Sequence, residues 1–277
     1  METFALAPAL RAALERLIDF AGLFPPAELP MEEAVASYDR ARASAPAWML
    51  GRFIVPAARL VELRGVLAEH PRFELSVIAA PGAFDLVARE RRANWATIGA
   101  LEVPLGDASV AACADAAEQT GLRDLPIFIE SRRVSQEGQF EVLAAHRFGA
   151  KLRCGGTLPE AFPSVSEVAA FIAQTSAAGV AFKATAGLHH PVRHFNAAAS
   201  VTMHGFLNLL VAALAAPRAD VAALERIIAE EDPAALISAL DDTAAVRSAR
   251  ARFVSYGSCS FDEPVDDLRA LRILAAG

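Results

Sequence analysis

The sequence predicts an α/β fold, a single (β/α)8 TIM barrel, and three observations point to it. Short runs rich in β-branched and aromatic residues occur eight times, and Ala-rich segments with helical patterning separate them. The starts of most runs are spaced by the length of one strand and one helix, which is the repeat of a parallel barrel. The chain has 277 residues and 54% hydrophobic composition, enough for one such core. We therefore expect residues 1–277 to form a single domain.

The expected strands contain β-branched or aromatic residues and are bounded by glycine, proline or polar residues. They cover residues 17–24, 51–57, 74–80, 98–105, 126–131, 149–156, 181–187 and 252–259. The segment SVSEVAAFIAQTSAAG is typical of the helices between them, because it begins with serine and acidic residues and ends in glycine.

One interval is about twice as long as the others, the one between the seventh and eighth strands. Residues 192–250 therefore form an insertion beyond one crossover helix, and their pattern predicts helices. The expected helices cover 196–216, 218–231, 233–240 and 243–250. Residues 197–216 are too apolar to face water alone, so we expect this insertion to cover the C-terminal end of the barrel or to form a homo-oligomer contact.

Composition and charge exclude several classes of function. The net charge of −7 and the pI of about 5.4 argue against nucleic-acid binding. The N-terminus has no basic segment before an apolar run, and the three cysteines lie far apart in the sequence. A buried helix is a better interpretation of 197–216 than a membrane span, because it contains His204 and Asn208. We expect a cytoplasmic protein with no membrane partner.

Ionisable residues interrupt the apolar pattern of several expected strands. They are Asp19, Glu102, Glu130, Lys151, Arg153 and Lys183. One such residue alone would fit a strand end that reaches solvent. Six of them are better explained by convergence at the C-terminal end of the barrel, where TIM-barrel active sites lie. Buried charges are costly unless they are paired, so the acids and bases should neutralise one another.

The two lysines predict carbonyl chemistry. Lys151 and Lys183 are one strand–helix unit apart, so they should lie on neighbouring strands at one level of the barrel. Burial and a neighbouring cation both disfavour an ammonium group, so the pKa of the nucleophile should be lowered, and a neutral amine can form a Schiff base. Lys151 is the expected nucleophile because Arg153 lies on its face of the strand. Lys183 is the expected tuning cation, with Thr185 as a hydroxyl neighbour.

The order of these motifs resembles that of the deoxyribose-phosphate aldolase family. The matching stretches are LIDF (17–20), Glu102, Glu130-Ser131, Lys151-Leu-Arg-Cys-Gly155, Lys183-Ala-Thr-Ala-Gly187 and Gly257-Ser258-Cys259-Ser260. The resemblance implies a class I aldolase-like carbon–carbon lyase in which Lys151 is the nucleophile, Lys183 tunes it and Glu102 moves protons. The chain departs from the family at Arg153, at Cys154 and in residues 188–194.

The remaining expected substrate contacts surround these residues. Asp19, Glu130, Thr185, His189 and His190 are candidates at the strand ends. Arg153 can bind a substrate carboxylate through two parallel hydrogen bonds. The substrate is then a small carbonyl compound, with or without an anionic group.

The loop Gly257-Ser258-Cys259-Ser260 is a candidate phosphate site, because backbone N–H groups at a short helix start bind anions. Asp262 and Glu263 follow at once and would repel an anion, and they favour the first turn of the last helix instead.

Two other functions remain open at this stage. His189 and His190, with Glu102 and Glu130, are residue types that hold a divalent metal in a barrel lyase or hydrolase. The chain has no HxH or HExxH spacing, so we expect neither a metal nor another cofactor. The third possibility is a non-catalytic barrel that binds a small ligand.

Overall fold

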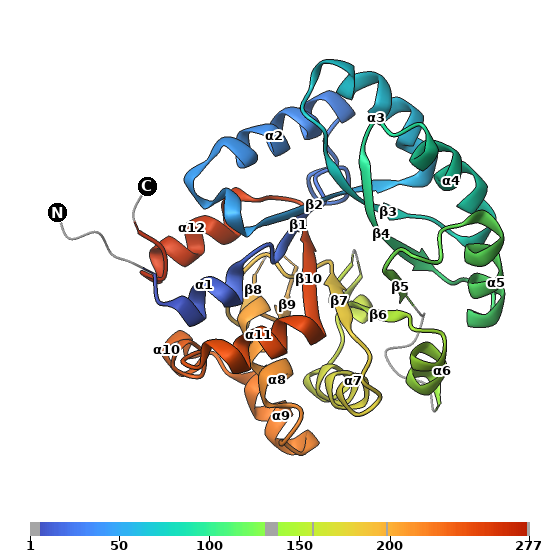
Figure 1. Cartoon of the computed structure of the whole chain (residues 1–277). Coiled ribbons are helices and arrows are strands. Elements are labelled where there is room, and N and C mark those ends of the chain that lie inside the picture. The colour runs from blue at the N-terminus through green and yellow to red at the C-terminus, as the bar shows by residue number, and fades with distance from the viewer. Residues whose placement is uncertain (1–5, 131–137, 157, 198, 276–277) are drawn as a thin grey trace.

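The computed structural model describes residues 6–130, 138–156, 158–197 and 199–275, and its centre is a closed barrel of eight parallel strands. Figure 1 shows the helices arranged around this central ring. The barrel strands are β1 (Ile18–Phe20), β2 (Leu50–Pro56), β3 (Glu74–Ile78), β4 (Thr97–Pro104), β5 (Ile127–Glu130), β6 (Gly149–Arg153), β7 (Phe182–Thr185) and β10 (Phe253–Ser258). Each lies within the expected run or within one residue of it, so the predicted TIM barrel is confirmed. Ser131, in the fifth expected strand, lies outside the described residues.

Helices follow the strands on the outside of the barrel. They are α1 (Pro8–Leu14), α2 (Met31–Ala43), α3 (Leu60–Val66), α4 (Phe84–Arg92), α5 (Val110–Thr120), α6 (Gln139–Ala145), α7 (Val165–Ala177), α8 (Phe206–Ala215), α9 (Val221–Ala229), α10 (Pro233–Ser238), α11 (Thr243–Arg252) and α12 (Asp262–Ala270). Short 3₁₀ helices cover Ala45–Met49, Ala57–Arg59, Leu67–Glu69, Pro81–Ala83 and Pro159–Ala161. The predicted start of α7 is a capping box, in which Ser164 and Glu167 each bond the other's backbone N–H.

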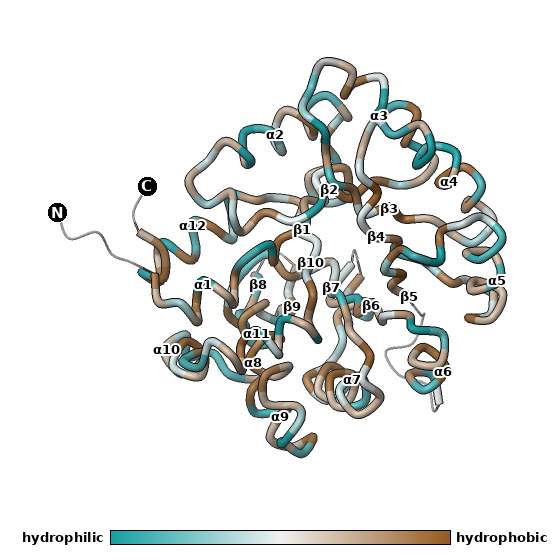
Figure 2. The backbone as a smooth tube through the Cα atoms, viewed as in Figure 1, coloured by the Kyte–Doolittle hydropathy of each residue, from teal (hydrophilic) through white to brown (hydrophobic). Residues whose placement is uncertain are grey.

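The hydrophobic core lies mainly between the strands and the helices. Outward-facing strand residues such as Phe182 and Phe253 stack with ring centroids 5.0 Å apart, and Phe171 of α7 packs edge-on against Phe182. Figure 2 shows the outer helices alternating between hydrophilic and hydrophobic colours along their length. Because the outward strand faces supply this core, the inward faces are free to carry polar side chains.

The insertion begins differently from the predicted helix. His194–Asn196 (β8) pairs antiparallel with Val201–Met203 (β9), and α8 begins only at Phe206. The expected helix over 196–216 is therefore wrong for its first ten residues. The β-branched pair Val201 and Thr202 favours a strand. Asn196 fixes the turn by accepting a hydrogen bond from the Ala199 N–H at 3.0 Å.

Helix α8 is buried by other parts of the same chain. It contacts α7, α9, α11 and β10, and these elements lie together in the lower part of Figure 1. The apolar composition of this segment is therefore satisfied on the flank of the barrel. Burial of this helix therefore requires neither the C-terminal end of the barrel nor a subunit contact. Among the described residues, no helix combines the length and apolarity that a membrane span requires.

The two polar residues near this helix are satisfied inside the fold. Asn208 donates to the carbonyls of Ile227 and Glu230, and its Oδ1 accepts from the Arg193 N–H. His204 is buried, with Nε2 2.7 Å from the carbonyl oxygen of Pro163. Both side chains tie α8 to neighbouring segments, which is a structural role.

Candidate active site

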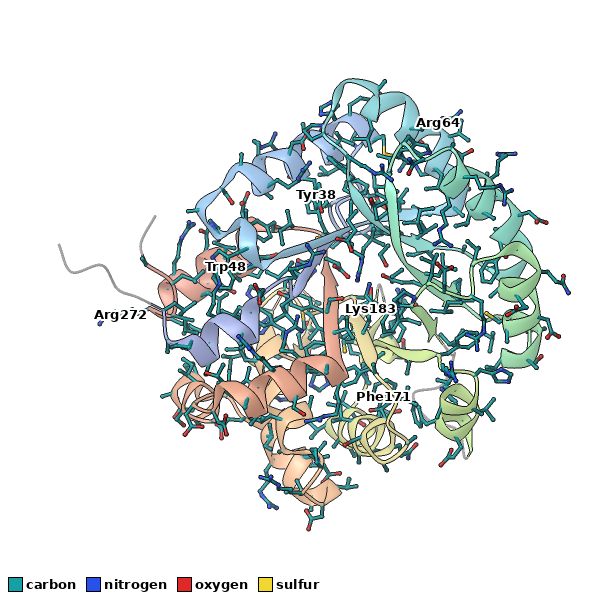
Figure 3. The ribbon with its side chains drawn as sticks, in the orientation of Figure 1. Tyr38, Trp48, Arg64, Phe171, Lys183 and Arg272 are labelled. Atoms are coloured by element: carbon teal, nitrogen blue, oxygen red, sulfur yellow. The ribbon has the colours of Figure 1, made fainter. Side chains whose placement is uncertain are left out.

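The six ionisable strand residues converge inside the barrel, as their spacing predicted. The parallel register aligns Glu130 with Lys151, Lys151 with Lys183, and Lys183 with Ser255 across four consecutive strands. Figure 3 shows Lys183 near the centre of the ring of strands. The two lysines thus occupy one level of the barrel on adjacent strands.

The inner half of the site is a buried set of ion pairs around Lys183. Its Nζ lies 2.7 Å from Asp19 Oδ2 and forms a short contact with Glu102 Oε1. It also donates to Ser76 Oγ at 3.1 Å. Asp19, Glu102 and Lys183 are each about 1% exposed. An ammonium group has three N–H donors, and here three acceptors satisfy them.

The outer half of the site is built around Lys151. Its Nζ lies 2.8 Å from Glu102 Oε2 and 2.8 Å from Glu130 Oε2. The other oxygen of Glu130 is 3.7 Å from Arg153 Nη1. Among the described residues, Lys151 therefore has two ionic partners, whereas Lys183 has three acceptors.

Together these contacts make one chain of alternating charge. We call it the ion-pair chain, and it runs Asp19–Lys183–Glu102–Lys151–Glu130–Arg153. Side-chain exposure rises along its outer part from 4% at Lys151 to 20% at Glu130 and 53% at Arg153. The chain therefore leads from the sealed interior toward the C-terminal end, where Arg153 is its most exposed member.

The charges shift the pKa values of the central pair in opposite directions. Burial favours a neutral Lys151, but the carboxylates of Glu102 and Glu130 outweigh it and raise the pKa of the ammonium. Burial likewise favours a neutral Glu102, but Lys151 and Lys183 hold the pKa of that carboxyl far below its usual value. The expected lowering of the pKa of Lys151 is therefore wrong. Two carboxylates lie 2.8 Å from Lys151 Nζ, so the structure holds this amine in its ammonium form.

Several residues that complete the site were not among the predicted ones. Ser76 donates to Glu102 Oε1 at 2.6 Å and Ser255 donates to Asp19 Oδ2 at 2.7 Å. The Arg52 backbone N–H donates to Asp19 Oδ1 at 2.6 Å. The sequence signal for the serines is weak, because one small hydroxyl at an inward position of an apolar strand resembles ordinary strand composition.

A stronger signal lies in the lysine count. The chain contains two lysines, Lys151 and Lys183, whereas the other 24 of its 26 basic side chains are arginine. Both lysines are in the ion-pair chain. Arginine cannot lose its proton in a protein, whereas lysine can. The chain thus has lysine side chains only at the site where an amine nucleophile is proposed.

The layer above the lysines contains the other strand-end candidates. Thr185 aligns with Arg153 on one side and Gly257 on the other. A Cβ placed on Gly257 would lie 3.0 Å from Ile54 Cδ1 and 3.4 Å from Thr185 Oγ1. Gly257 therefore keeps the space above Lys183 narrow but free of a side chain. After Thr185 the chain enters the left-handed region at Ala186, with φ 59, a strained conformation that often occurs at functional sites.

The candidate phosphate loop uses its hydroxyls locally. Ser258 is buried and donates to the Ser260 carbonyl oxygen at 2.6 Å. Ser260 Oγ accepts from the Glu263 N–H at 3.2 Å, in the first turn of α12. These contacts fit the helix-capping interpretation of the acidic residues that follow the loop.

The two loop histidines pair with α12. His189 Nδ1 lies 2.8 Å from Glu263 Oε2, and His190 Nδ1 lies 2.5 Å from Asp267 Oδ2. Glu102 and Glu130, the carboxylates proposed to join them in a metal site, contact the lysines instead. In the described part of the chain, no three side chains of His, Cys, Asp or Glu are arranged to hold a metal ion.

The cysteines near the site are poor thiolate candidates. Cys154 is buried, and burial raises the pKa of its thiol far above the usual value. Cys259 is less buried and lies 3.8 Å from His189 Nδ1, and burial again raises its thiol pKa. Neither thiol has the electropositive, exposed surroundings of a reactive cysteine.

Comparisons with known proteins do not place the chain in a family. No protein-family model matches it, and neither curated proteins nor solved structures give a match.

Proposed function

We propose that this protein is a Schiff-base (class I) aldolase-type lyase that acts on a small carbonyl substrate. The observation that carries the proposal is Lys151. It is a buried amine in the outer half of the ion-pair chain, with a carboxylate on each side and, among the described residues, two ionic partners for its three N–H donors. Lys183 is the weaker candidate nucleophile, because its three donors are already bound.

The carboxylates beside Lys151 support the proton transfers that such chemistry requires. The ammonium first gives a proton to Glu130 or Glu102, and the neutral nitrogen attacks the carbonyl carbon. Loss of water then gives a protonated imine. A carboxylate takes the proton of the hydroxyl group on the β carbon, the bond between the α and β carbons breaks, and the β carbon leaves as a carbonyl compound while the electron pair of the bond forms the enamine. A carboxylic acid then returns a proton to the α carbon, and water hydrolyses the imine to free the amine of Lys151. General acid–base catalysis of this kind contributes about 10²- to 10⁴-fold in rate.

Lys183 acts through Glu102 in this scheme. It bonds one oxygen of Glu102, while Lys151 bonds the other. Removal of the Lys183 charge would let Glu102 hold the Lys151 proton more tightly. With Lys183 in place, Glu102 holds the Lys151 proton less tightly. Lys183 therefore makes the ammonium group of Lys151 easier to deprotonate.

Arg153 is the group that would bind an anionic part of the substrate. Its guanidinium is half exposed, and its one ionic contact among the described residues is the long one to Glu130. An arginine fork matches a carboxylate or phosphate oxygen pair. A keto acid or an aldehyde that carries an anionic group would place its carbonyl toward Lys151 and its charge toward Arg153.

The test is reductive trapping with borohydride across a panel of aldehydes and keto acids, read by intact-protein and peptide mass spectrometry. The chain offers few amines, namely Lys151, Lys183 and the α-amine of its N-terminus. A covalent adduct can therefore be assigned to one residue. We expect an adduct on Lys151.

Two substitutions sharpen this experiment. Lys151→Ala abolishes the adduct, and Lys151→Arg does the same while keeping a cation between the two carboxylates, which separates loss of the amine from loss of the fold. Lys183→Ala still traps, but more slowly and at higher pH. An adduct on Lys183 would reverse the two roles. If no compound in the panel forms an adduct on either lysine, a non-catalytic ligand-binding barrel is favoured. If chelators abolish turnover of a substrate found in the panel, the metal-dependent lyase or hydrolase is favoured.

A further inference from the structure

A cavity lies at the N-terminal end of the barrel, at the other end from Arg153. Its volume is about 280 Å³, and it is bounded by the residues before β1 and β3, by α2, and by the start of β2. Its lining includes Arg16, Tyr38, Arg42, Gly51, Arg72 and Glu74. Tyr38, labelled in Figure 3, donates its hydroxyl to the Gly51 carbonyl oxygen at 2.7 Å.

The charge of this lining is opposite in sign to that of the whole protein. Three arginines and one glutamate face the cavity, whereas the chain carries a net charge of −7. The one carboxylate is already saturated, because Glu74 Oε2 lies 2.5 Å from Arg16 and its Oε1 lies 2.8 Å from Arg52 Nε. The lining therefore keeps a surplus of positive charge.

The arginines retain hydrogen-bond donors that these contacts do not use. Among the described residues, Arg16 and Arg42 each bond an acid through a single nitrogen. The acid beside Arg42 is also shared, because Asp39 Oδ2 lies 2.6 Å from His70 Nδ1. Arg72 is held in place by Asn94, Thr97 and the Ala96 carbonyl oxygen, through its Nε and Nη2. N–H groups from three separate segments of the chain are therefore left for a ligand.

We propose that this cavity binds a phosphoryl group. A phosphate monoester carries a charge near −2 at neutral pH and accepts hydrogen bonds from several directions. The surplus charge of the lining and the placement of its three arginines around one space match those properties. A single carboxylate would use one arginine fork and leave the other guanidinium groups unmatched.

The test is direct titration of the full chain with inorganic phosphate by calorimetry at low ionic strength. Chloride at matched ionic strength is the reference, because an acidic protein responds to salt in general. A titration with methyl phosphate distinguishes the sources of the group. Tighter binding of methyl phosphate would identify an organic monoester as the ligand, and tighter binding of phosphate would identify the free ion. Equal heats and equal thermal stabilisation with chloride would overturn the proposal.

Three variants locate the site. Arg42→Gln removes a cavity guanidinium and should weaken phosphate binding about tenfold or more, since each 1.4 kcal/mol is a factor of ten. Glu74→Gln removes the competing carboxylate and should tighten binding. Arg59→Gln is the matched control, because it removes one arginine charge from an exposed pair with Glu62 outside the cavity. An equal loss of binding in Arg42→Gln and Arg59→Gln would overturn the site, and so would weaker binding in Glu74→Gln.

Discussion

The charged side chains at the two ends of the barrel are arranged differently. Toward the C-terminal end, three acids and three cations alternate in the ion-pair chain, and its inner members are almost fully buried. At the N-terminal end, three arginines share a cavity with one carboxylate. The first arrangement is neutral and satisfied, and the second keeps a positive surplus that water or an anion must balance.

The type of basic residue also differs between the two ends of the barrel. The ion-pair chain contains both lysines together with Arg153, whereas the basic residues that line the cavity are all arginines. An ammonium group can give its proton to a neighbouring carboxylate, whereas a guanidinium stays charged. The C-terminal end is therefore suited to proton transfer, and the N-terminal end to holding an anion.

The segment formed by Gly51 and Arg52 contacts both regions. Gly51 lines the N-terminal cavity, and a Cβ placed on it would lie 2.1 Å from Asp19 Oδ1, at the inner end of the ion-pair chain. The next N–H, that of Arg52, binds the same oxygen. This segment makes the comparison testable, because a change at Gly51 acts on both regions.

The largest effect is expected from Glu102→Gln. The substitution leaves two buried ammonium groups without the carboxylate that joins them, and breaking a buried pair in this way costs about 3–5 kcal/mol. Urea unfolding at neutral pH measures the loss. Glu62→Gln, in an exposed pair with Arg59, is the control and should change stability by less than about 1 kcal/mol. Equal losses in the two variants would mean that the buried ion-pair chain contributes no more to the free energy of unfolding than an exposed ion pair does.

The next largest effect is expected from Gly51→Ala. The added methyl group must displace Asp19 from the Arg52 N–H or shift the β1–β2 pair, at a cost of about 1–3 kcal/mol. Gly65→Ala is the matched control, because nothing lies within 4 Å of its Cβ position on exposed α3. That substitution should instead stabilise the protein by about 0.5–1 kcal/mol. Thermal unfolding of both variants measures the difference, and a neutral Gly51→Ala would show that Asp19 is not held as described.

A smaller effect concerns acid stability. The folded-state pKa of Glu102 is depressed from the ordinary 4.5, so its ion pairs contribute stability above that pH and lose it as the pH falls toward the folded-state pKa. Glutamine has no such titration. The stability difference between the wild type and Glu102→Gln should therefore shrink below pH 4.5, as measured by urea unfolding across the acid range. A difference that stays constant with pH would contradict the depressed pKa.

The smallest change is expected from Glu130→Gln. Glu130 is one of the two carboxylates that raise the pKa of Lys151, so its removal should lower that pKa. The pH at which borohydride trapping reaches half its maximal rate should then move toward acid, while the fold is retained because Glu130 is partly exposed. A shift toward alkali would indicate that Glu130 acts mainly as the proton acceptor rather than as an electrostatic partner.

Sequence patterns predicted the fold closely because they report strand burial directly. Short runs of β-branched and aromatic residues placed all eight barrel strands, and the same runs singled out the ionisable residues within them. They failed for the hairpin at 194–203, where an Ala-rich composition hid the β-branched pair at Val201 and Thr202. A helix prediction averages composition over many neighbouring residues, whereas the formation of a short hairpin depends on a few particular residues.

The sequence by itself determined which side chains could act as amine nucleophiles. Its two lysines lie on one pair of neighbouring strands. Only the tertiary structure decided what those residues do to one another. A strand pattern shows that Lys151 faces the interior, but its pKa depends on which charges lie within a few ångströms, and Glu102 and Glu130 come from other strands. The arginine cavity has the same origin, because Arg16, Arg42 and Arg72 are distant in sequence and meet only after the barrel has closed.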